Sequence, residues 1–521
     1  SLAVSPGETL GVVGESDSGK SVTAFATMGL LERAGRITAG RIVFRGENIT
    51  AAPRSVMQPL RGAAMSMIFQ NPRTALNPIR SVGLQIADAL RAHRPLSLSA
   101  ATAAALELLK AVRIRDPEKR LHAYPHELSG GMCQRVMISI ALACEPALLI
   151  ADEPTTGLDV TTQKTVMDIV TKLTRERDMA MILITHDLGL AAQYCDRIAV
   201  MEQGQVVETA DPSRLFSQPQ HGYTRRLVAA SPRRGSTVAS LVVDATMPAA
   251  KMAPPPMRKP GAGPLLDIRN LVKLFPGGVT AVNDVSFRIG AGESLGLVGE
   301  SGSGKSTISR LVCRLMNQTS GEIIFDGEDI GAIPERDFHR CALRRDIQIV
   351  FQDPSDSLNP RFTAFDSIVD PLRRLLGESG ATALRARARE IATRVGLPID
   401  LLDRFPHQLS GGQKARVGIA RAIAVDPRLL ILDEPTAALD VSVQAVVLHL
   451  LDRLRRESGL AFLFVSHDLN VVRMMCERLV VLQNGAIVEH GVSQAIFDEP
   501  QTDYARELLA AIPHFDPEAR A

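Results

Sequence analysis

The feature that most constrains this chain is an internal repeat, in which long motifs return in the same order about 280 residues later. SPGETLGVVGES (5–16) returns as GAGESLGLVGES (290–301), and LLIADEPTTGLD (148–159) returns as LLILDEPTAALD (429–440). A nearly constant offset across several separate motifs indicates duplication of a whole domain. The sequence therefore predicts two copies of one fold.

The repeat divides the 521-residue chain into two domains and a linker. We predict a first domain over 1–235 and a second over 265–521. Residues 236–264 are rich in Pro, Gly and Ala, which favours an extended, weakly structured linker. The second copy carries an extra segment, ending at Val285, ahead of the position that aligns with Ser1. We therefore expect the chain as given to lack the N-terminal strands of its first domain.

Composition excludes several classes of function. The formal net charge of +2 gives no broad basic field, so nucleic acid is not expected as a partner. No stretch approaches about twenty uncharged apolar residues, so no segment is predicted to span a bilayer. The six cysteines are scattered, without a CxxC pair or a close Cys/His cluster. This pattern predicts free thiols and no zinc site.

Each copy holds a GxxxxGKS loop between an apolar run and a helical stretch: GESDSGKS (14–21) and GESGSGKS (299–306). Such loops aim backbone N–H groups at phosphate oxygens, with a helix N-terminus behind them. Lys20 and Lys305 would reach the β and γ phosphates of a nucleotide. The residues predicted to bind the nucleotide here are Gly14, Glu15, Ser16, Asp17, Ser18, Gly19, Lys20, Ser21 and Val22, and Gly299, Glu300, Ser301, Gly302, Ser303, Gly304, Lys305, Ser306 and Thr307.

An acidic pair ends an apolar run in both copies, as LLIADE and LLILDE. The first acid is expected to hold hydrated Mg²⁺ together with the last Ser of the phosphate loop, and the second is placed to polarise the attacking water. A His that follows a further apolar run would contact the γ phosphate. The predicted groups are Ser21 with Asp152 and Ser306 with Asp433 for the metal, and Glu153 with His186 and Glu434 with His467 for catalysis.

LSGG occurs at an apparent helix start in both copies, with Ser129, Gly130 and Gly131 in the first and Ser410, Gly411 and Gly412 in the second. A serine and two glycines there offer a hydroxyl and exposed N–H groups to an anion. A nucleotide already held by a phosphate loop, a lysine and Mg²⁺ hardly needs a second cradle from the same domain. Each LSGG is therefore expected to serve the nucleotide held by the opposite domain.

With these motifs the chain resembles the ATP-binding-cassette ATPases over nearly its whole length. The resemblance implies an α/β fold of two P-loop NTPase domains, each with a RecA-like core, an antiparallel β portion and a helical subdomain that bears LSGG. It also implies a glutamine loop, whose Gln70 and Gln352 join the metal ligands, and a D-loop at Leu158–Asp159 and Leu439–Asp440.

Domains of this family pair head to tail around two ATP molecules. The resemblance therefore implies one mixed site in which Lys20, Glu153 and His186 face Ser410 and Gly412. The other site would join Lys305, Glu434 and His467 to Ser129 and Gly131.

Finer features are similar to the peptide/nickel-type bacterial importers: FQNPRTALNP (69–78), FQDPSDSLNP (351–360) and the tail DPSRLFSQPQHGYTRRLVAASP (211–232). This likeness implies a peripheral ATPase subunit on the cytoplasmic face of the inner membrane, with two permease subunits and, indirectly, a substrate-binding protein. Peptides, glutathione-like conjugates, nickel chelates and opines are all candidate solutes. Some relatives carry an iron–sulfur cluster on cysteines near the C-terminus of the domain. Because no cysteine follows Cys476, no cluster is predicted.

Two alternatives stay open at this stage. A tandem ATPase that acts on ribosomes or DNA would usually carry a charged helical linker, zinc-binding cysteines or coiled-coil insertions, none of which the sequence shows. Export instead of import is harder to separate, because the ATPase motifs do not set direction. The branch resemblance favours import.

Asp17 stands where the second loop has Gly302. Asp tolerates positive φ better than most residues, so the loop should still form. A carboxylate at about 6 Å from one phosphate charge is opposed by roughly 2–3 kcal/mol at an effective dielectric near 20. Val22 stands where the second loop has the hydroxyl of Thr307. Phe275 is a candidate to stack on adenine or, alternatively, a core residue, and its equivalent in the first copy would fall in the segment expected to be missing. We predict weaker ATP binding or turnover at the first site; a tolerated substitution is the alternative.

Overall fold

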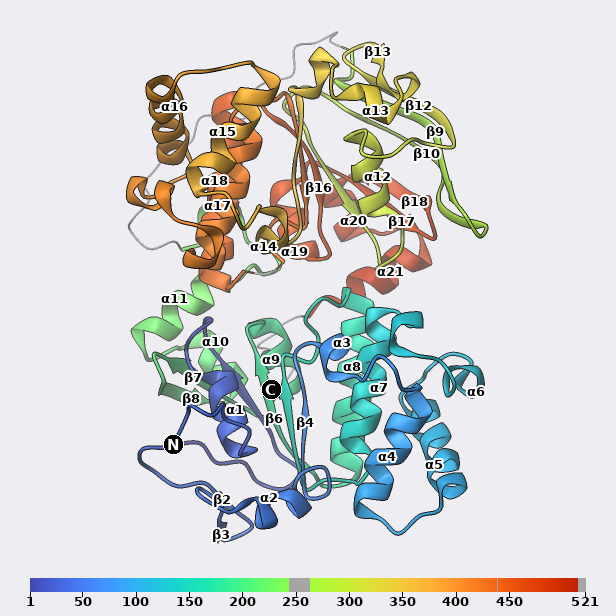
Figure 1. The fold of residues 1–521 in the computed structure, drawn as a ribbon, viewed down its shortest axis with the longest axis vertical. Coiled ribbons are helices and arrows are strands. Elements are labelled where there is room, and N and C mark those ends of the chain that lie inside the picture. The colour runs from blue at the N-terminus through green and yellow to red at the C-terminus, as the bar shows by residue number, and fades with distance from the viewer. Residues whose placement is uncertain (243–262, 438, 514–521) are drawn as a thin grey trace. The chain divides into compact units, whose positions relative to one another are not determined.

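The computed structural model describes residues 1–242, 263–437 and 439–513 (Figure 1). The described chain forms two compact units. The first comprises Ser1–Leu158, Thr162–Val228 and Pro513, and the second comprises Asp159–Thr161 and Ala229–Ile512. Most of the predicted linker, residues 243–262, lies outside the described residues.

The first unit is built on a six-stranded sheet with the order β4-β5-β6-β1-β7-β8. The first five strands in this order run parallel, and β8 pairs antiparallel with β7. Strands β1, β4 and β5 are buried along their whole length, which explains why their sequences are largely apolar. The strands are β1 (Thr9–Val13), β4 (Met65–Ile68), β5 (Leu148–Asp152), β6 (Ala180–Thr185), β7 (Arg197–Glu202) and β8 (Gln205–Ala210), and a separate antiparallel pair is β2 (Val43–Phe44) with β3 (Glu47–Asn48).

The helices of this part of the chain are α1 (Lys20–Thr27), α2 (Arg54–Leu60), α3 (Pro72–Ala75), α4 (Val82–His93), α5 (Leu98–Ala111), α6 (Pro117–Arg120), α7 (Gly130–Leu142), α8 (Val160–Glu176), α9 (Leu188–Tyr194), α10 (Pro212–Ser217) and α11 (Gly222–Ala230). Helices α4, α5 and α7 pack against one another as a helical group (Figure 1). Ile86, Leu109 and Val136 are among the side chains that they bury. This group is the helical subdomain that the family resemblance implied.

The second unit repeats the same sheet, in the order β14-β15-β16-β11-β17-β18, again with only the last strand antiparallel. Its strands are β11 (Ser294–Val298), β14 (Ile347–Val350), β15 (Leu429–Asp433), β16 (Ala461–Val465), β17 (Arg478–Gln483) and β18 (Ala486–Val492). Two units with one strand order are what duplication of a whole domain produces.

An antiparallel sheet completes the second unit, with the strand order β10-β9-β12-β13. Its strands are β9 (Leu266–Phe275), β10 (Val279–Ile289), β12 (Ser320–Phe325) and β13 (Glu328–Asp329). Ile268 and Phe287 of this sheet share one apolar cluster with Leu295 and Leu297 of the parallel sheet. The two sheets are therefore joined by a common core. The antiparallel sheet is the antiparallel β portion that the family resemblance implied for this domain.

The helices of the second unit are α12 (Lys305–Val312), α13 (Glu335–Phe338), α14 (Pro354–Ser357), α15 (Ala364–Leu375), α16 (Ala381–Arg394), α17 (Gly411–Ile423), α18 (Val441–Ser458), α19 (Leu469–Met475), α20 (Ser493–Asp498) and α21 (Asp503–Ala510). Helices α15, α16 and α17 form the group that corresponds to α4, α5 and α7. No described helix is long and apolar enough to cross a lipid bilayer.

The described beginning of the predicted linker is not extended. Val238–Ser240 forms a short 3₁₀ helix, and Val238 and Leu241 are buried. The backbone oxygen of Leu241 lies 3.0 Å from Nε2 of His449 on α18. The apolar side chains of Val238 and Leu241 account for this packing, because a fully solvated linker would leave such side chains in water.

In both units the topology determines where the site lies. The strand before the phosphate loop (β1 or β11) is central, with the strand before the histidine (β6 or β16) beside it and the acidic strand (β5 or β15) next. Carboxyl ends of parallel strands meet at one edge of a sheet, where α/β proteins bind ligands. Loop, acidic pair and histidine therefore converge within each unit.

Candidate nucleotide-binding site

The phosphate loops curl tightly at the ends of β1 and β11. Gly299 has a φ of 148°, and a Cβ placed there would lie 2.2 Å from the backbone oxygen of Leu482. No side chain fits at that position. Asp17 has a φ of 64°, and Gly302 has 82°. The first loop thus forms with Asp in the positive-φ conformation that the sequence predicted, and the Asp17 side chain is exposed.

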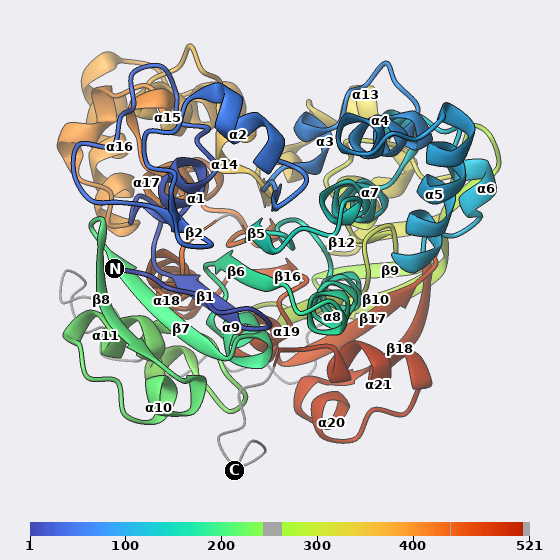
Figure 2. The ribbon, with the colours of Figure 1, turned by 90° about the horizontal axis from the view of Figure 1, so that it is seen from below.

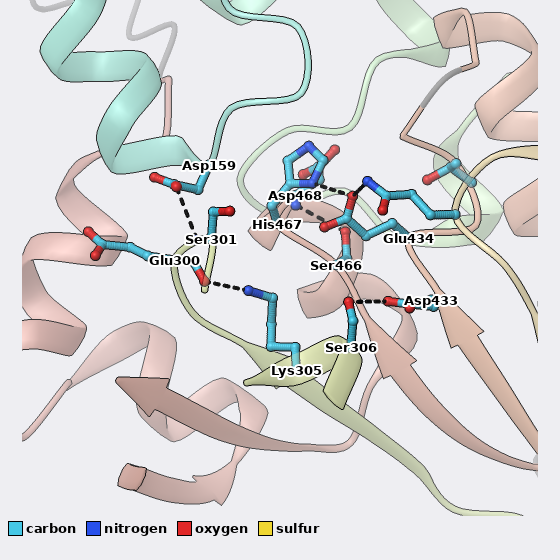
Figure 3. Close-up of polar contacts among 12 residues, drawn as sticks. Asp159, Glu300, Ser301, Lys305, Ser306, Asp433, Glu434, Ser466, His467 and Asp468 are labelled. Atoms are coloured by element: carbon cyan, nitrogen blue, oxygen red, sulfur yellow. Dashed lines mark hydrogen bonds and ion pairs between the residues drawn. The ribbon is translucent and has the colours of Figure 1, made fainter. Parts of the chain in front are cut away.

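The loop lysines are buried and fold back over the loops that carry them. Lys305 Nζ donates to the backbone oxygen of Glu300 at 2.7 Å (Figure 3). It also donates to the backbone oxygen of Gly299 at 2.7 Å. Lys20 makes the equivalent bonds in the first unit, at 2.8 and 2.6 Å. Burial lowers the pKa of the Lys305 ammonium, although nearby acids raise it. Because burial disfavours the charged form of an ammonium group, a nearby anion with several negative charges, such as a polyphosphate, would stabilise it strongly.

The predicted metal ligands come together in pairs. Ser306 Oγ donates to Asp433 Oδ1 at 3.3 Å, and Ser21 Oγ donates to Asp152 Oδ1 at 3.0 Å. Burial, followed by the charge of Glu434, raises the pKa of Asp433 to about 6. Burial likewise raises the pKa of Asp152. A serine hydroxyl beside a buried carboxylate is a donor set suited to Mg²⁺, which keeps waters and phosphate oxygens as its other ligands.

The predicted catalytic glutamate of the second unit is held by two side chains. Gln352 Nε2 donates to Glu434 Oε2 at 2.6 Å. His467 Nδ1 lies 3.2 Å from the same oxygen (Figure 3). Burial alone would raise the pKa of Glu434, but the hydrogen bond and charge of His467 lower it below its usual value. Burial lowers the pKa of His467, and its bond to Glu434 outweighs that effect and raises it. Glu434 is therefore ionised at neutral pH.

The first unit repeats this arrangement with Gln70, Glu153 and His186. Gln70 Nε2 donates to Glu153 Oε2 at 2.8 Å, and His186 Nδ1 lies 3.2 Å from Glu153 Oε1. Against the effect of burial, these bonds lower the pKa of Glu153 to about 2. Each glutamine uses its amide nitrogen on the glutamate, so the predicted metal role would fall to the amide oxygen.

One feature of the glutamates had no sequence signal. Glu153 has a φ of 47° and Glu434 has a φ of 51°. Non-glycine residues adopt such angles at a cost, and strain of this kind concentrates at functional sites. The sequence EPT at the end of the acidic strand predicts a bend in the backbone, but it does not predict that φ of the glutamate is positive.

LSGG lies at a helix start in both units, as predicted. Ser129 caps α7 and accepts from the Met132 N–H at 3.4 Å. Ser410 caps α17 and accepts from Gln413 in the same way. Both serines are exposed. A Cβ on Gly412 would lie 2.5 Å from Val443 Cγ1, so close packing requires glycine there.

The predicted D-loop residue Asp159 lies in the second unit. Its Oδ2 accepts a hydrogen bond from the N–H of Ser301 at 3.0 Å (Figure 3). The Thr161 hydroxyl contacts the carboxylates of both Asp159 and Glu300. The phosphate loop of the second unit is therefore braced by residues 159–161.

Phe275, the candidate for adenine stacking, ends β9 and is 37% exposed. Lys273 Nζ lies 5.4 Å from the centre of its ring. An exposed ring beside a cation is available to a base, and the stacking role stays a prediction.

All six cysteines are free thiols, as the sequence predicted. Burial raises the pKa of Cys313 and Cys476 to about 12, which makes both unreactive at neutral pH. Within the described residues, no group of three or more His, Cys, Asp or Glu side chains could hold a metal ion. The expected absence of zinc and iron–sulfur sites stays a prediction.

Comparison with protein families gives two matches, each of them present twice. The model described as "ABC transporter" matches residues 1–156 and 282–437. The model described as "Oligopeptide/dipeptide transporter, C-terminal region" matches residues 207–255 and 488–521.

Curated relatives match along the whole chain. Glutathione import ATP-binding protein GsiA of Escherichia coli O157:H7 is 45% identical, over 99% of this chain and 86% of that protein. GsiA of Pectobacterium atrosepticum is 44% identical, over 100% of this chain and 86% of that protein.

Solved structures match one cassette at a time. CbiO1 from Clostridium perfringens, part of the ABC transporter complex cbiONQ, is 29% identical with a TM-score of 0.41, over 46% of this chain and 92% of that chain. The ATP-binding cassette MJ0796 bound to ADP and Pi is 32% identical with a TM-score of 0.41, over 44% of this chain and 98% of that chain.

Two matches to the family model, and an identity of 45% along nearly the full length, agree with the duplicated motifs and their geometry. No comparison supports the alternative of an ATPase that acts on ribosomes or DNA. The chain belongs to the ABC transporter family, as a tandem ATP-binding protein and ATPase.

Proposed function

We propose that this protein is the ATP-hydrolysing subunit of a bacterial importer for peptides or related small solutes, with glutathione as the leading candidate. The observation that carries this proposal is the C-terminal region of oligopeptide and dipeptide transporters, which is matched after both cassettes. Relatives at 45% identity are named as glutathione import ATP-binding proteins. Nickel chelates and opines are the other members of the proposed solute class.

The geometry supports ATP hydrolysis with Mg²⁺. Ser306 and Asp433 would hold the ion, which neutralises phosphate charge when it is bound. Lys305 binds the β and γ phosphates. Glu434 is ionised and orients the attacking water, whose proton its carboxylate accepts. His467 fixes that carboxylate through a contact of 3.2 Å.

We further propose that the two cassettes of the chain pair head to tail, so that each LSGG completes the site of the opposite cassette. Two exposed helix starts, capped by Ser129 and Ser410, support this. Neither N-terminus is needed by a nucleotide that already has a phosphate loop, a lysine and a metal site. Fusion in one chain would raise the effective concentration of one cassette near the other.

The proposed partners are two permease subunits, with a substrate-binding protein acting through them. The protein would then work peripherally at the cytoplasmic face of the inner membrane. To test this, the full-length protein is purified from native membranes in mild detergent, and retained proteins and small molecules are identified by mass spectrometry. Two permeases and a binding protein loaded with a peptide or glutathione are expected. Ribosomal proteins or nucleic acid without a permease would contradict the proposal.

We also propose that the Asp17 site binds ATP more weakly than the Lys305 site. The Asp17 carboxylate is exposed, so water and salt screen its repulsion to less than the full Coulomb value. Asp17→Gly should therefore strengthen ATP binding at the first site by about 3- to 10-fold. Binding of a fluorescent ATP analogue to the assembled transporter, which should resolve two affinities, measures the change.

The second loop supplies the matched control for Asp17. Gly302→Asp places the same carboxylate at a backbone position that already has positive φ, at 82°. It should weaken the tighter of the two binding phases by a similar factor. If Asp17→Gly changes neither phase, the substitution is tolerated and the two sites are equivalent.

A further inference from the structure

A buried tyrosine contacts each phosphate loop from behind. In the first unit, Tyr223 Oη accepts a hydrogen bond from the N–H of Glu15 at 2.9 Å. In the second, Tyr504 Oη accepts one from the N–H of Glu300 at 3.0 Å. The two side chains are only 5% and 8% exposed. The same contact thus forms in both units, and the segments PQHGYTRRL (219–227) and PQTDYAREL (500–508) also share Pro, Gln, Arg and Leu around the tyrosine.

These tyrosines come from the C-terminal region that follows the last strand of each sheet. Tyr223 lies in α11 and Tyr504 in α21, within the two segments that match the oligopeptide and dipeptide transporter region. Figure 2 shows α10 and α11 beside β7 and β8, and α20 and α21 beside β17 and β18. The hydroxyls therefore reach the loops from segments that are distant in sequence.

Each tyrosine-bearing helix is anchored to its sheet by one glutamate. Glu208 on β8 accepts from the backbone N–H groups of Gln220 and His221, at 2.8 and 2.9 Å. Glu489 on β18 accepts from the N–H groups of the two residues before α21, at 2.9 and 3.0 Å. A carboxylate that accepts hydrogen bonds from two consecutive backbone amides fixes the start of the helix, and the position of the helix in turn fixes that of the tyrosine ring.

The bonded amide belongs to the residue that also orients the lysine. Glu300 donates its N–H to Tyr504, and its backbone oxygen accepts from Lys305 Nζ at 2.7 Å. Glu15 is held in the same way between Tyr223 and Lys20. One residue of each loop is thus fixed on one side by the C-terminal region and on the other by the phosphate-binding ammonium. Loss of the phenol oxygen would leave this N–H without its acceptor.

We propose that Tyr223 and Tyr504 are positioning residues for ATP binding, through which the C-terminal region holds the phosphate loop and its lysine in the binding conformation. Both hydroxyls contact the loop backbone, at the amides of Glu15 and Glu300, so we expect neither tyrosine to touch the reacting atoms. Their effect should fall on nucleotide affinity and leave the hydrolytic step unchanged. The helix that follows the sheet thereby becomes part of the nucleotide site in each cassette.

The test uses the full-length chain in the assembled transporter. Tyr504→Phe removes only the hydroxyl, and should raise KM for ATP by about 3- to 10-fold with kcat changed by less than about twofold. Tyr223→Phe should act in the same direction at the first site. Tyr194→Phe is the matched control, because Tyr194 is buried and its hydroxyl donates to Asp168 at 2.7 Å, away from the loops. KM should not change in that variant.

Hydrogen–deuterium exchange gives a readout that is independent of activity. Without nucleotide, the peptide that contains the Glu300 amide should exchange faster in Tyr504→Phe than in the parent chain, and Tyr194→Phe should leave it unchanged. If Tyr504→Phe folds poorly, Glu489→Gln loosens the helix anchor without touching the tyrosine and should raise KM in the same direction. Unchanged KM and exchange, a loss confined to kcat, or an equal effect of Tyr194→Phe would each overturn the proposal.

Discussion

Replacing Glu434 by Gln should lower the rate of ATP hydrolysis at the second site by about 10²- to 10⁴-fold. The amide has nearly the shape of the carboxylate but cannot accept the proton of the attacking water. Bonds from Gln352 and His467 hold Glu434 in its ionised form, so an existing base is lost. Phosphate release at saturating MgATP measures the rate, and a separate binding assay should show that ATP affinity is retained.

Two variants make this result specific. Glu457→Gln changes an exposed glutamate on α18 and should leave the rate unchanged. Glu153→Gln makes the same change in the first site and should cost less of the total turnover, because the first site is proposed to hold ATP more weakly. A normal rate in Glu434→Gln would remove Glu434 from the mechanism. If Glu153→Gln and Glu434→Gln lower the ATPase rate equally, only the proposed asymmetry between the two sites is contradicted.

Much of this fold could be predicted because its signals are local. Strand β15 is buried along its whole length, so its sequence, LLILD, is an apolar run that ends at the metal ligand. The phosphate loop and LSGG are likewise short patterns whose glycines meet close neighbours, as Gly299 and Gly412 do. Duplication strengthened each signal, since a pattern that occurs twice at one offset is not accidental.

The contacts that sequence reasoning missed are long-range. Tyr223 lies 208 residues from the Glu15 amide that it accepts from, and no spacing rule connects the two. The pairing of Gln352 with Glu434, across 82 residues, depends on β14 lying beside β15. The positive φ of Glu153 and Glu434 likewise arises where the acidic strand ends at the site. Such features arise when elements pack, and only the repeat of the tyrosine within PQHGYTRRL (219–227) and PQTDYAREL (500–508) could have directed attention to it.

Lysine replacement should produce the largest effect on nucleotide binding. Lys305→Ala is expected to raise KM for ATP by about 10- to 100-fold, because bonds between a charged group and a phosphate contribute roughly 1.5–3 kcal/mol. In the structure this ammonium is buried and already held by the oxygens of Gly299 and Glu300, so little entropy is lost when phosphate binds. Titration of the ATPase rate with MgATP gives KM, and binding of a fluorescent ATP analogue checks it.

The matched variants are Lys20→Ala in the first loop and Lys172→Ala on the exposed face of α8. The exposed lysine should leave KM unchanged. Lys20→Ala should weaken only the first site, because Lys20 belongs to that loop. This site is proposed to have the lower affinity, since Asp17 opposes phosphate there. If Lys305→Ala leaves KM near its parent value, the buried ammonium serves the loop and not the nucleotide. The tyrosine that shares Glu300 with Lys305 would then stabilise the fold alone, so this variant bears on both roles at once.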